Sequence, residues 1–425
     1  MDCYKQENKI NYKTYGHIEK SIGKGSMKMD KKIKKANIII YLQSLLQFQG
    51  FIGPVIFIFY TRYMGLSISQ YLLCDSLLFV IMAICEIPSG VIADYIGRKK
   101  MLVISSFAIC FGMVILLTIP NYIGAIIVAV IYGVFGALQS GVSQSILYET
   151  YESCNSIKQY EYTQSKASSV GFIISIVYAI ISGYMVEYNL ALPVLLDLAI
   201  CILSILASVL LLEDNRNYSK KESMVLPNKK DIHNVIYVIV VVSILSSCSR
   251  VMFSFYQPIL TEAKFPIFFL GYASASYSLI TAGASFFYKR IRERLSTEKM
   301  YLLIIALQFL TTIGIVFVNG YFVIAFIFLQ QIQRGLMGPF LYMQVNRYID
   351  TNNKNRVSLM SMMYCGISIF TGISLYITSA ITNSSGLQRA VFYYVTVINA
   401  ILILALIIFV GKEKTNQLMK YDSER

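Results

Sequence analysis

Apolar stretches long enough to cross a lipid bilayer recur along nearly the whole chain. Of its 425 residues, 56% are hydrophobic and 14% are charged, whereas soluble globular proteins carry about 25% charged residues. About 20 apolar residues, rising 1.5 Å each in a helix, cross a hydrocarbon core of roughly 30 Å. The sequence therefore predicts an all-α membrane protein with twelve transmembrane helices. They are expected at residues 36–60, 69–92, 101–119, 122–148, 167–186, 190–212, 234–260, 265–288, 300–318, 321–346, 357–382 and 390–410.

The positions of lysine and arginine test this number of helices and orient them. With the N-terminus in the cytoplasm, 32 of the 37 Lys and Arg residues fall in predicted cytoplasmic segments, and only Arg62, Lys264 and Arg389 fall in external loops. Such an excess marks the cytoplasmic side of membrane proteins. We therefore expect a multi-pass protein of the plasma membrane with both termini in the cytoplasm. The net charge of +14 then reflects topology, and the basic tails are expected to meet anionic lipid.

The chain offers little for catalysis or metal binding. It has two histidines and eight cysteines without a Cys-x-x-Cys pair, so we expect no metal site, disulfide framework or histidine-based catalytic centre. Glycines and lysines in residues 16–26 do not have the spacing of a phosphate-binding loop. The expectation is a protein that is not an enzyme and that binds no cofactor, metal, nucleotide or nucleic acid.

Residues 90–100, GVIADYIGRKK, join the second and third predicted helices. Two glycines permit a sharp turn and close packing, and an acid and three cations lie beside them at the cytoplasmic membrane edge. In the form G-x-x-x-D-x-x-G-R-K, the segment resembles the signature loop between helices 2 and 3 of major facilitator superfamily (MFS) transporters. The residues of this motif are Gly90, Asp94, Gly97, Arg98 and Lys99.

The resemblance implies that this loop acts as a latch that holds the cytoplasmic side of the transporter closed. Asp94 would accept hydrogen bonds near the start of helix 11, around residues 357–360, where backbone N–H groups lack helical partners. Arg98 would pair with Glu149 at the end of helix 4. The alternative is that these charges only set the topology and the turn between helices 2 and 3.

A shift of 194 residues aligns the two halves of the sequence. Residues 138–141 then fall on 332–335, and Arg98 falls on Arg292. Two pseudo-symmetric six-helix bundles are the layout of the MFS fold. The expected segments are a basic cytoplasmic tail (1–35), an N-terminal bundle (36–212), a cytoplasmic linker (213–233), a C-terminal bundle (234–410) and a C-terminal tail (411–425).

Five charged residues lie inside predicted helices, where a charge at mid-bilayer costs about 2.5–3.5 kcal/mol or more. Asp75 and Glu86 share one helix face and are candidates for proton coupling, because a carboxylate in an apolar site can exchange protons near neutral pH. The alternative for both, and the expectation for Asp197, is a static ion pair between helices. Helices 7 and 10 line the cavity in the MFS fold, so the resemblance makes Arg250 and Arg334 candidate substrate contacts. For Arg334 the alternatives are the counter-charge of Glu86 or a substrate contact.

Two further segments resemble one bacterial branch of the family that includes many drug exporters. Residues 86–90, EIPSG, match its E-x-P-[ST]-G pattern, and residues 140–141 and 147–149 match its helix 4. Two elements of many drug–proton antiporters are absent: Ala137 stands where helix 4 carries arginine, and helix 5 has no Gly-Pro element. Polar and aromatic residues at repeat-related positions complete the candidate cavity; they are Gln139, Gln333, Tyr148 and Tyr342.

The leading functional prediction is a monomeric, proton-coupled secondary transporter that exports a drug-like or peptide-derived small molecule by alternating access. One alternative is an importer of a nutrient or anionic metabolite, in which Arg250 and Arg334 bind the anion. Another, from a different class, is a non-transporting membrane sensor on the same fold.

Overall fold

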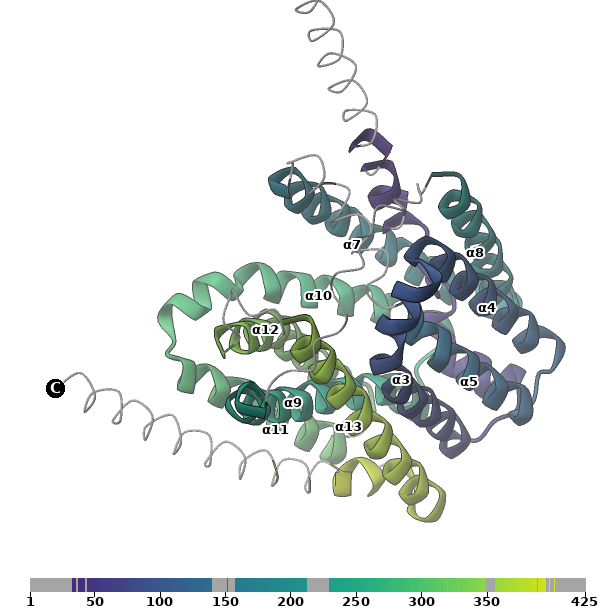
Figure 1. Cartoon of the computed structure of the whole chain (residues 1–425). Coiled ribbons are helices and arrows are strands. Elements are labelled where there is room, and N and C mark those ends of the chain that lie inside the picture. Colours follow the sequence, from purple (N-terminus) through teal and green to yellow (C-terminus); the bar gives the residue numbers. More distant parts are fainter. Residues whose placement is uncertain are drawn as a thin grey trace, which may run out of the picture.

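Helices form nearly all of the regular structure in the computed structural model (Figure 1). It describes residues 33–139 apart from 36 and 43, residue 151, residues 157–211, residues 229–348 apart from 319, and residues 356–401 apart from 388, 395, 396 and 398–400. The longer helices are α3 (Ile68–Ile96), α4 (Arg98–Thr118), α5 (Tyr122–Gln139), α7 (Ile157–Tyr188), α8 (Leu192–Leu211), α9 (Lys229–Glu262), α10 (Ile267–Arg294), α11 (Thr297–Phe317), α12 (Val323–Tyr348) and α13 (Arg356–Ser385).

Seven helices in the described part of the chain are long and apolar enough to cross a membrane, and two shorter apolar helices accompany them. Each predicted span from the second to the eleventh corresponds to one of the ten helices α3 to α13. The protein is therefore a multi-pass helical membrane protein. The full number of twelve spans and the cytoplasmic position of the termini remain predictions.

The first predicted helix, 36–60, is wrong as a single element. The chain is helical in the described residues from 33 to 45, leaves the helix at 46–52, and becomes helical again in three short pieces. These are η1 (Gly53–Val55), α2 (Ile56–Ile58) and a π-helical turn η2 (Phe59–Tyr63). The local sequence favours a new helix start here, because Pro54 lacks the N–H group that would continue the preceding helix and is tolerated in a first helical turn. We call residues 46–57, where the helix is interrupted and resumes in short pieces, the helix-1 break.

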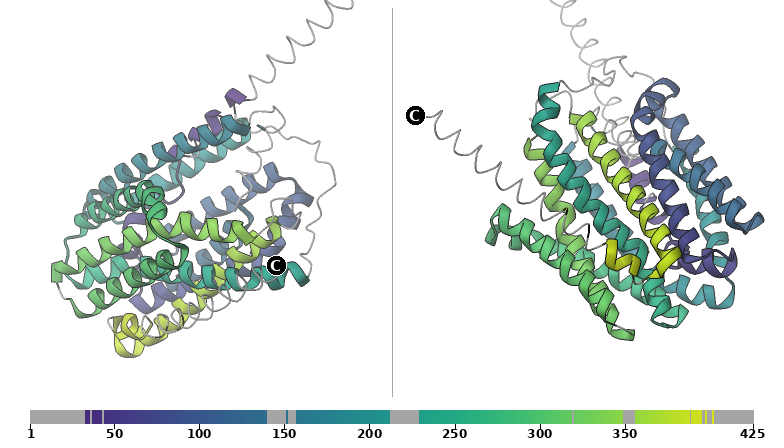
Figure 2. Two further views of the ribbon diagram at one scale, coloured as in Figure 1. Left: turned by 90° about the vertical axis from the view of Figure 1, so that its left-hand side faces the viewer. Right: turned by 90° about the horizontal axis from the view of Figure 1, so that it is seen from below.

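The described helices form two groups that follow the order of the chain. The first half, up to Leu211, packs α3, α4, α5 and α8 together, and the second half, from Lys229, packs α9 to α13. The halves meet along two helix pairs, α3 with α13 and α7 with α10. The right-hand view in Figure 2 shows α13, in yellow-green, beside the blue helices of the first half.

Small residues let these helix pairs approach closely. Gly183 of α7 and Gly271 of α10 face each other, and a Cβ atom on either would overlap a backbone carbonyl oxygen of the other helix. A Cβ on Gly372 of α13 would overlap the side chain of Val80 on α3. Helices in membranes commonly approach through glycine in this way. Both contacts therefore depend on the absence of a side chain.

The turn between α3 and α4 has the geometry that the signature loop predicts. Gly97 joins the two helices with a φ of 95°, in the region that favours glycine over residues with a Cβ atom. Arg98 and Lys99 begin the next helix directly after it. The motif therefore places its cations at the first turn of α4.

Candidate functional site

One face of α9 carries polar residues toward the first half of the chain. Arg250, Ser254 and Gln257 recur at the spacing of a single helix face. The Ser254 hydroxyl donates a hydrogen bond of 2.7 Å to Oδ2 of Asp75 on α3. Arg250 is the cation that acts electrostatically on Asp75. The acid on α3 and the arginine on α9 therefore belong to one site at the contact between the halves.

A second arginine joins this site through an aromatic ring. The guanidinium carbon of Arg334 on α12 lies 4.3 Å from the ring centroid of Phe253, and that of Arg250 lies 5.6 Å from the same centroid. Arg250 also lies 5.1 Å from the ring centroid of Phe79 on α3. These distances are within the range of cation–π attraction. We call Arg250 and Arg334 the guanidinium pair.

The guanidinium pair places two like charges close together. Their distances to the Phe253 ring limit the separation of the two guanidinium carbons to about 10 Å. At an effective dielectric constant of about 20, two unit charges at that distance repel by about 1.7 kcal/mol. Among the described residues, neither guanidinium group has a hydrogen-bond partner or a salt bridge within 4 Å, and Asp75 is the carboxylate that acts on Arg250. Within this part of the chain, the pair is incompletely neutralised.

Glu86 lies on α3 and not with the guanidinium pair. Its electrostatic neighbour is Cys365 of α13, whose thiol lies 3.5 Å from the carbonyl oxygen of Ala83. The charged group that acts on Arg334 is Arg250 rather than Glu86. The expectation that Arg334 is the counter-charge of Glu86 is therefore wrong in this conformation. Glu86 is half-buried at the seam between α3 and α13.

Asp197 of α8 binds the helix-1 break. Its side chain is almost completely buried, and its two carboxylate oxygens accept hydrogen bonds from the backbone N–H groups of Phe51 (3.0 Å) and Ile52 (2.8 Å). A backbone N–H group without a partner in hydrocarbon costs several kcal/mol. Asp197 thus acts as a cap supplied by another helix. The expected ion pair is wrong, because its partners are backbone groups.

Gln257 of α9 binds the other side of the same break from the second half. Its Oε1 accepts a hydrogen bond of 3.0 Å from the N–H of Phe57, and its Nε2 donates one of 2.9 Å to the carbonyl oxygen of Gly53. Its side chain is buried, and Nε2 also donates to the Tyr256 hydroxyl at 2.8 Å. Gln257 therefore bridges the two halves through the backbone of helix 1.

Two carbonyl groups just before the break, those of Ser44 and Leu45, also have side-chain partners, and Gln47 links this segment to Gly171 of α7. Gln47 Nε2 donates to the carbonyl oxygens of Ser44 (3.0 Å) and Gly171 (2.7 Å), and the Tyr178 hydroxyl donates to that of Leu45 (2.7 Å). The sequence prediction missed this arrangement. The available signal was a run of Gly50, Gly53 and Pro54 inside a span predicted as one helix.

Several predicted site residues lie outside the described part of the molecule. They are the side chains of Asp94, Arg98, Gln139 and Tyr342, and the whole of Tyr148 and Glu149. Gln333 is described; it is completely buried, and its Nε2 lies 3.8 Å from the sulfur of Met337 on the same helix.

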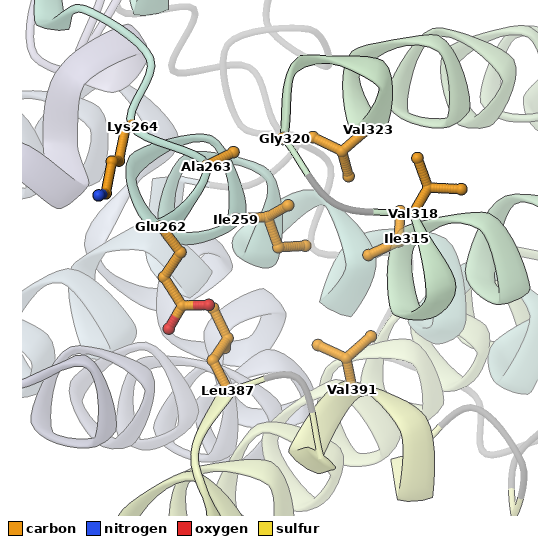
Figure 3. Close-up of a pocket in the computed structure, with 10 residues that line it drawn as sticks. All are labelled: Ile259, Glu262, Ala263, Lys264, Ile315, Val318, Gly320, Val323, Leu387 and Val391. Atoms are coloured by element: carbon orange, nitrogen blue, oxygen red, sulfur yellow. The ribbon is translucent and has the colours of Figure 1, made fainter.

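A cavity of about 260 Å³ lies elsewhere, within the second half (Figure 3). It is lined mainly by apolar residues at the ends of α9, α11 and α12 and at positions 387 and 391. The Glu262 carboxylate points into it beside Leu387, whereas Lys264 points away (Figure 3). None of the residues predicted for the functional site lines this cavity, so we place the candidate site at the guanidinium pair.

Comparison with protein families identifies the family to which this chain belongs. The sequence model of the Major Facilitator Superfamily matches residues 39–352 and 239–423. The chain belongs to this family. It is a transporter of the membrane and not an enzyme, and proteins of this kind bind small-molecule substrates within the membrane.

Solved structures show the same fold. Two crystal structures of the nucleoside transporter NupG, one of them of a point mutant, align with this chain, and both are 13% identical to it in sequence. The mutant structure has a TM-score of 0.72, and its alignment covers 88% of this chain and 99% of that one. The other structure has a TM-score of 0.69, with 89% and 98% covered. Among curated proteins, no match was found. At this identity the likeness establishes the fold and leaves the substrate open.

Proposed function

We propose that this protein is a proton-coupled secondary transporter that carries a small molecule across the plasma membrane by alternating access. The observation that carries the proposal is the location of the membrane charges. Asp75, Glu86 and the guanidinium pair all lie at or near the contact between the halves. In transporters built from two repeats, substrate and coupling ions bind at the interface between the repeats while the halves rock against each other.

The contacts between the halves support a definite state of this cycle. Ser69 meets Ser379, Ser76 donates to the carbonyl oxygen of Gly372, and Gly183 meets Gly271. These residues cluster toward one end of the bundle, where α3 begins and α7 ends. With both termini in the cytoplasm, that end is external. The structure then corresponds to a transporter closed toward the outside, and the loop of Asp94, Arg98 and Lys99 acts at the opposite end as the cytoplasmic latch.

Two directions of transport have support from different observations. The EIPSG segment at residues 86–90 favours export of a drug-like or peptide-derived molecule, as predicted from the sequence. The guanidinium pair favours the alternative, uptake of a nutrient or anionic metabolite. Uptake is therefore the second candidate function.

The deciding experiment compares compound distributions in cells. Cells that express the full chain, its Glu86→Gln variant or an empty vector are incubated with a mixture of drugs and metabolites, with and without a protonophore. Mass spectrometry then measures each compound inside and outside. We expect at least one compound to shift, and we expect the protonophore and Glu86→Gln to remove the shift.

Each result has a distinct meaning. A compound depleted from cells supports export, and one enriched in them supports uptake. A distribution identical to the empty vector for every compound would contradict transport. Unchanged proton-driven flux in Glu86→Gln would contradict coupling through that residue, while Glu187→Gln, at the exposed end of α7, serves as the control for loss of one acidic charge.

A further inference from the structure

The charge balance at the guanidinium pair constrains what binds there. Two arginines approach the ring of Phe253, and one carboxylate, Asp75, interacts electrostatically with Arg250. Among the described residues, Arg334 has no counter-charge. An arginine within a membrane span is ordinarily paired or faces a water-filled cavity, because a charge in hydrocarbon is costly.

The hydrogen-bonding capacity of the pair is also unused. Each guanidinium group has five N–H donors in a planar fork that matches a carboxylate or phosphate group. Asp75 instead accepts its hydrogen bond from Ser254. Among the described residues, no acceptor binds the forks of Arg250 or Arg334. Both therefore retain donors for a ligand.

Neighbouring polar groups point to a ligand rather than to packing. Gln330 lies one helical turn before Arg334 on the same face of α12, and its Oε1 is buried without a hydrogen-bond partner in the described structure. The hydroxyl of Tyr277 on α10 is likewise buried and unpaired there, and its ring lies 4.8 Å from that of Tyr256. Buried polar groups in native proteins are almost always paired. Gln330 thus offers an unused acceptor one turn from Arg334, and Tyr277 offers an unused hydroxyl next to Tyr256, which acts electrostatically on Arg334.

The site is also open to a ligand. Arg250 is exposed although it lies in the middle of a predicted span, and Arg334 is half-buried. An arginine exposed to hydrocarbon would be strongly unfavourable, so such residues ordinarily face a water-filled space between helices. The guanidinium pair therefore lies where a dissolved molecule can reach it.

We infer that the transported substrate is an organic anion, whose carboxylate or phosphate-ester group binds the guanidinium pair between α9 and α12. The inference rests on the proposed transport function and specifies its substrate class. A negative charge on the substrate would pair with Arg334, which has no counter-charge among the described residues, and the aromatic rings of Phe253 and Phe79 lie beside the guanidinium groups. A cationic substrate would add a third positive charge to the site. A neutral nucleoside would leave one guanidinium charge without a partner.

Binding can be tested without knowing the natural substrate or its direction of transport. The Tm of the purified full chain in lipid nanodiscs is measured with each compound of two matched sets. One set is 3-phenylpropionate with its corresponding amide and amine, and the other is hexanoate with its corresponding amide and amine. Phenyl phosphate and uridine complete the set, at constant ionic strength set by chloride. We expect an anion to raise Tm and the matched amide, amine and uridine to leave it unchanged.

Substitutions connect the shift to the two arginines. Arg250→Gln and Arg334→Gln are each expected to require at least about tenfold more anion for the same shift, because a charge-assisted, forked contact is lost. Arg334→Lys keeps the charge without the fork and is expected to give an intermediate result. Arg290→Gln, on an exposed position near the end of α10, removes the same charge elsewhere and should bind as the unaltered chain does.

The inference would be overturned by the absence of any shift with the anions, or by a shift that survives both Arg250→Gln and Arg334→Gln. A larger shift with the amines or uridine than with the anions would overturn it as well. This binding experiment uses no gradient, so its failure is separate from failure of the transport proposal. Anion binding in a chain that redistributes no compound in cells would contradict transport alone.

Discussion

The side-chain oxygen of Gln257 lies 3.0 Å from the backbone nitrogen of Phe57 and so joins helix α9 to the resumed part of helix 1. The same side chain also donates to the carbonyl oxygen of Gly53. One amide group thereby binds a donor and an acceptor of the other half of the molecule. Separating the two halves at this end of the bundle, where α7 and α9 end, requires both hydrogen bonds to break.

Gln257→Leu is expected to favour opening at this end. A hydrogen bond contributes about 1 kcal/mol net, so losing two shifts the equilibrium by more than about tenfold. Spin labels at Tyr188 and Lys264, both exposed near the ends of α7 and α9, should report a longer mean distance. Gln308→Leu, a buried change on α11 inside the second half, should leave the distance unchanged. An identical effect of both substitutions would refute the role of Gln257.

Asp197→Asn is expected to destabilise the protein. The amide group would place an N–H donor against one of two backbone N–H donors, and a buried unpaired donor costs about 1–3 kcal/mol. Thermal unfolding in nanodiscs should show a lower Tm for Asp197→Asn, and a lower one still for Asp197→Ala. Glu187→Gln on the exposed end of α7 should not change Tm. A variant as stable as the original chain would show that the cap is dispensable.

Gly271→Ala is expected to separate α7 from α10. The added methyl group would overlap the carbonyl oxygen of Ala179, whereas at Gly283 on the same helix it would enter open space. Alanine improves helix propensity at both positions by about 1 kcal/mol, so the comparison isolates the steric effect. We expect lower Tm and slower transport for Gly271→Ala only. Equal behaviour of the two variants would argue against a tight contact at this crossing.

Asp94→Asn tests the predicted cytoplasmic latch. Loss of the charge weakens the expected attraction to the start of α13, so the cytoplasmic side should open more often. Spin labels at Lys100 and Arg294, exposed residues near the turns that follow α3 and α10, should move apart, and Asp94→Glu should restore most of the original distance. No change in the distance distribution would leave the loop with a topological role only.

The position of the helices could be predicted from apolar runs because lipid imposes a minimum length on each span. The ends were less predictable. α7 begins at Ile157, ten residues before the predicted start at 167, because lysine, glutamate and glutamine continue a helix without being apolar. A helix can extend beyond the segment that crosses the membrane, and hydropathy detects only the apolar, membrane-crossing segment.

The residues of the candidate site could be predicted from the sequence, whereas the partners that they contact could not. Charge inside an apolar run identifies Asp75, Arg250 and Arg334, since each must have a reason to lie in the membrane. Their partners depend on helix rotation and on which helices meet, which a single sequence does not encode locally. For that reason the predicted pairing of Glu86 with Arg334 is wrong, and the binding of Asp197 to backbone groups could not be predicted.

The helix-1 break has a consequence for the order in which the protein is made. Its backbone groups are satisfied by Asp197 and Gln257, which follow them by 145 to 204 residues in the chain. When helix 1 leaves the ribosome, neither side chain exists, and the second half must be synthesised before Gly53 and Phe57 find their partners. Contacts so distant in sequence form late. Helix 1 is thus translated before the partners that complete its backbone hydrogen bonds, and it reaches its final structure only after the second half has been made.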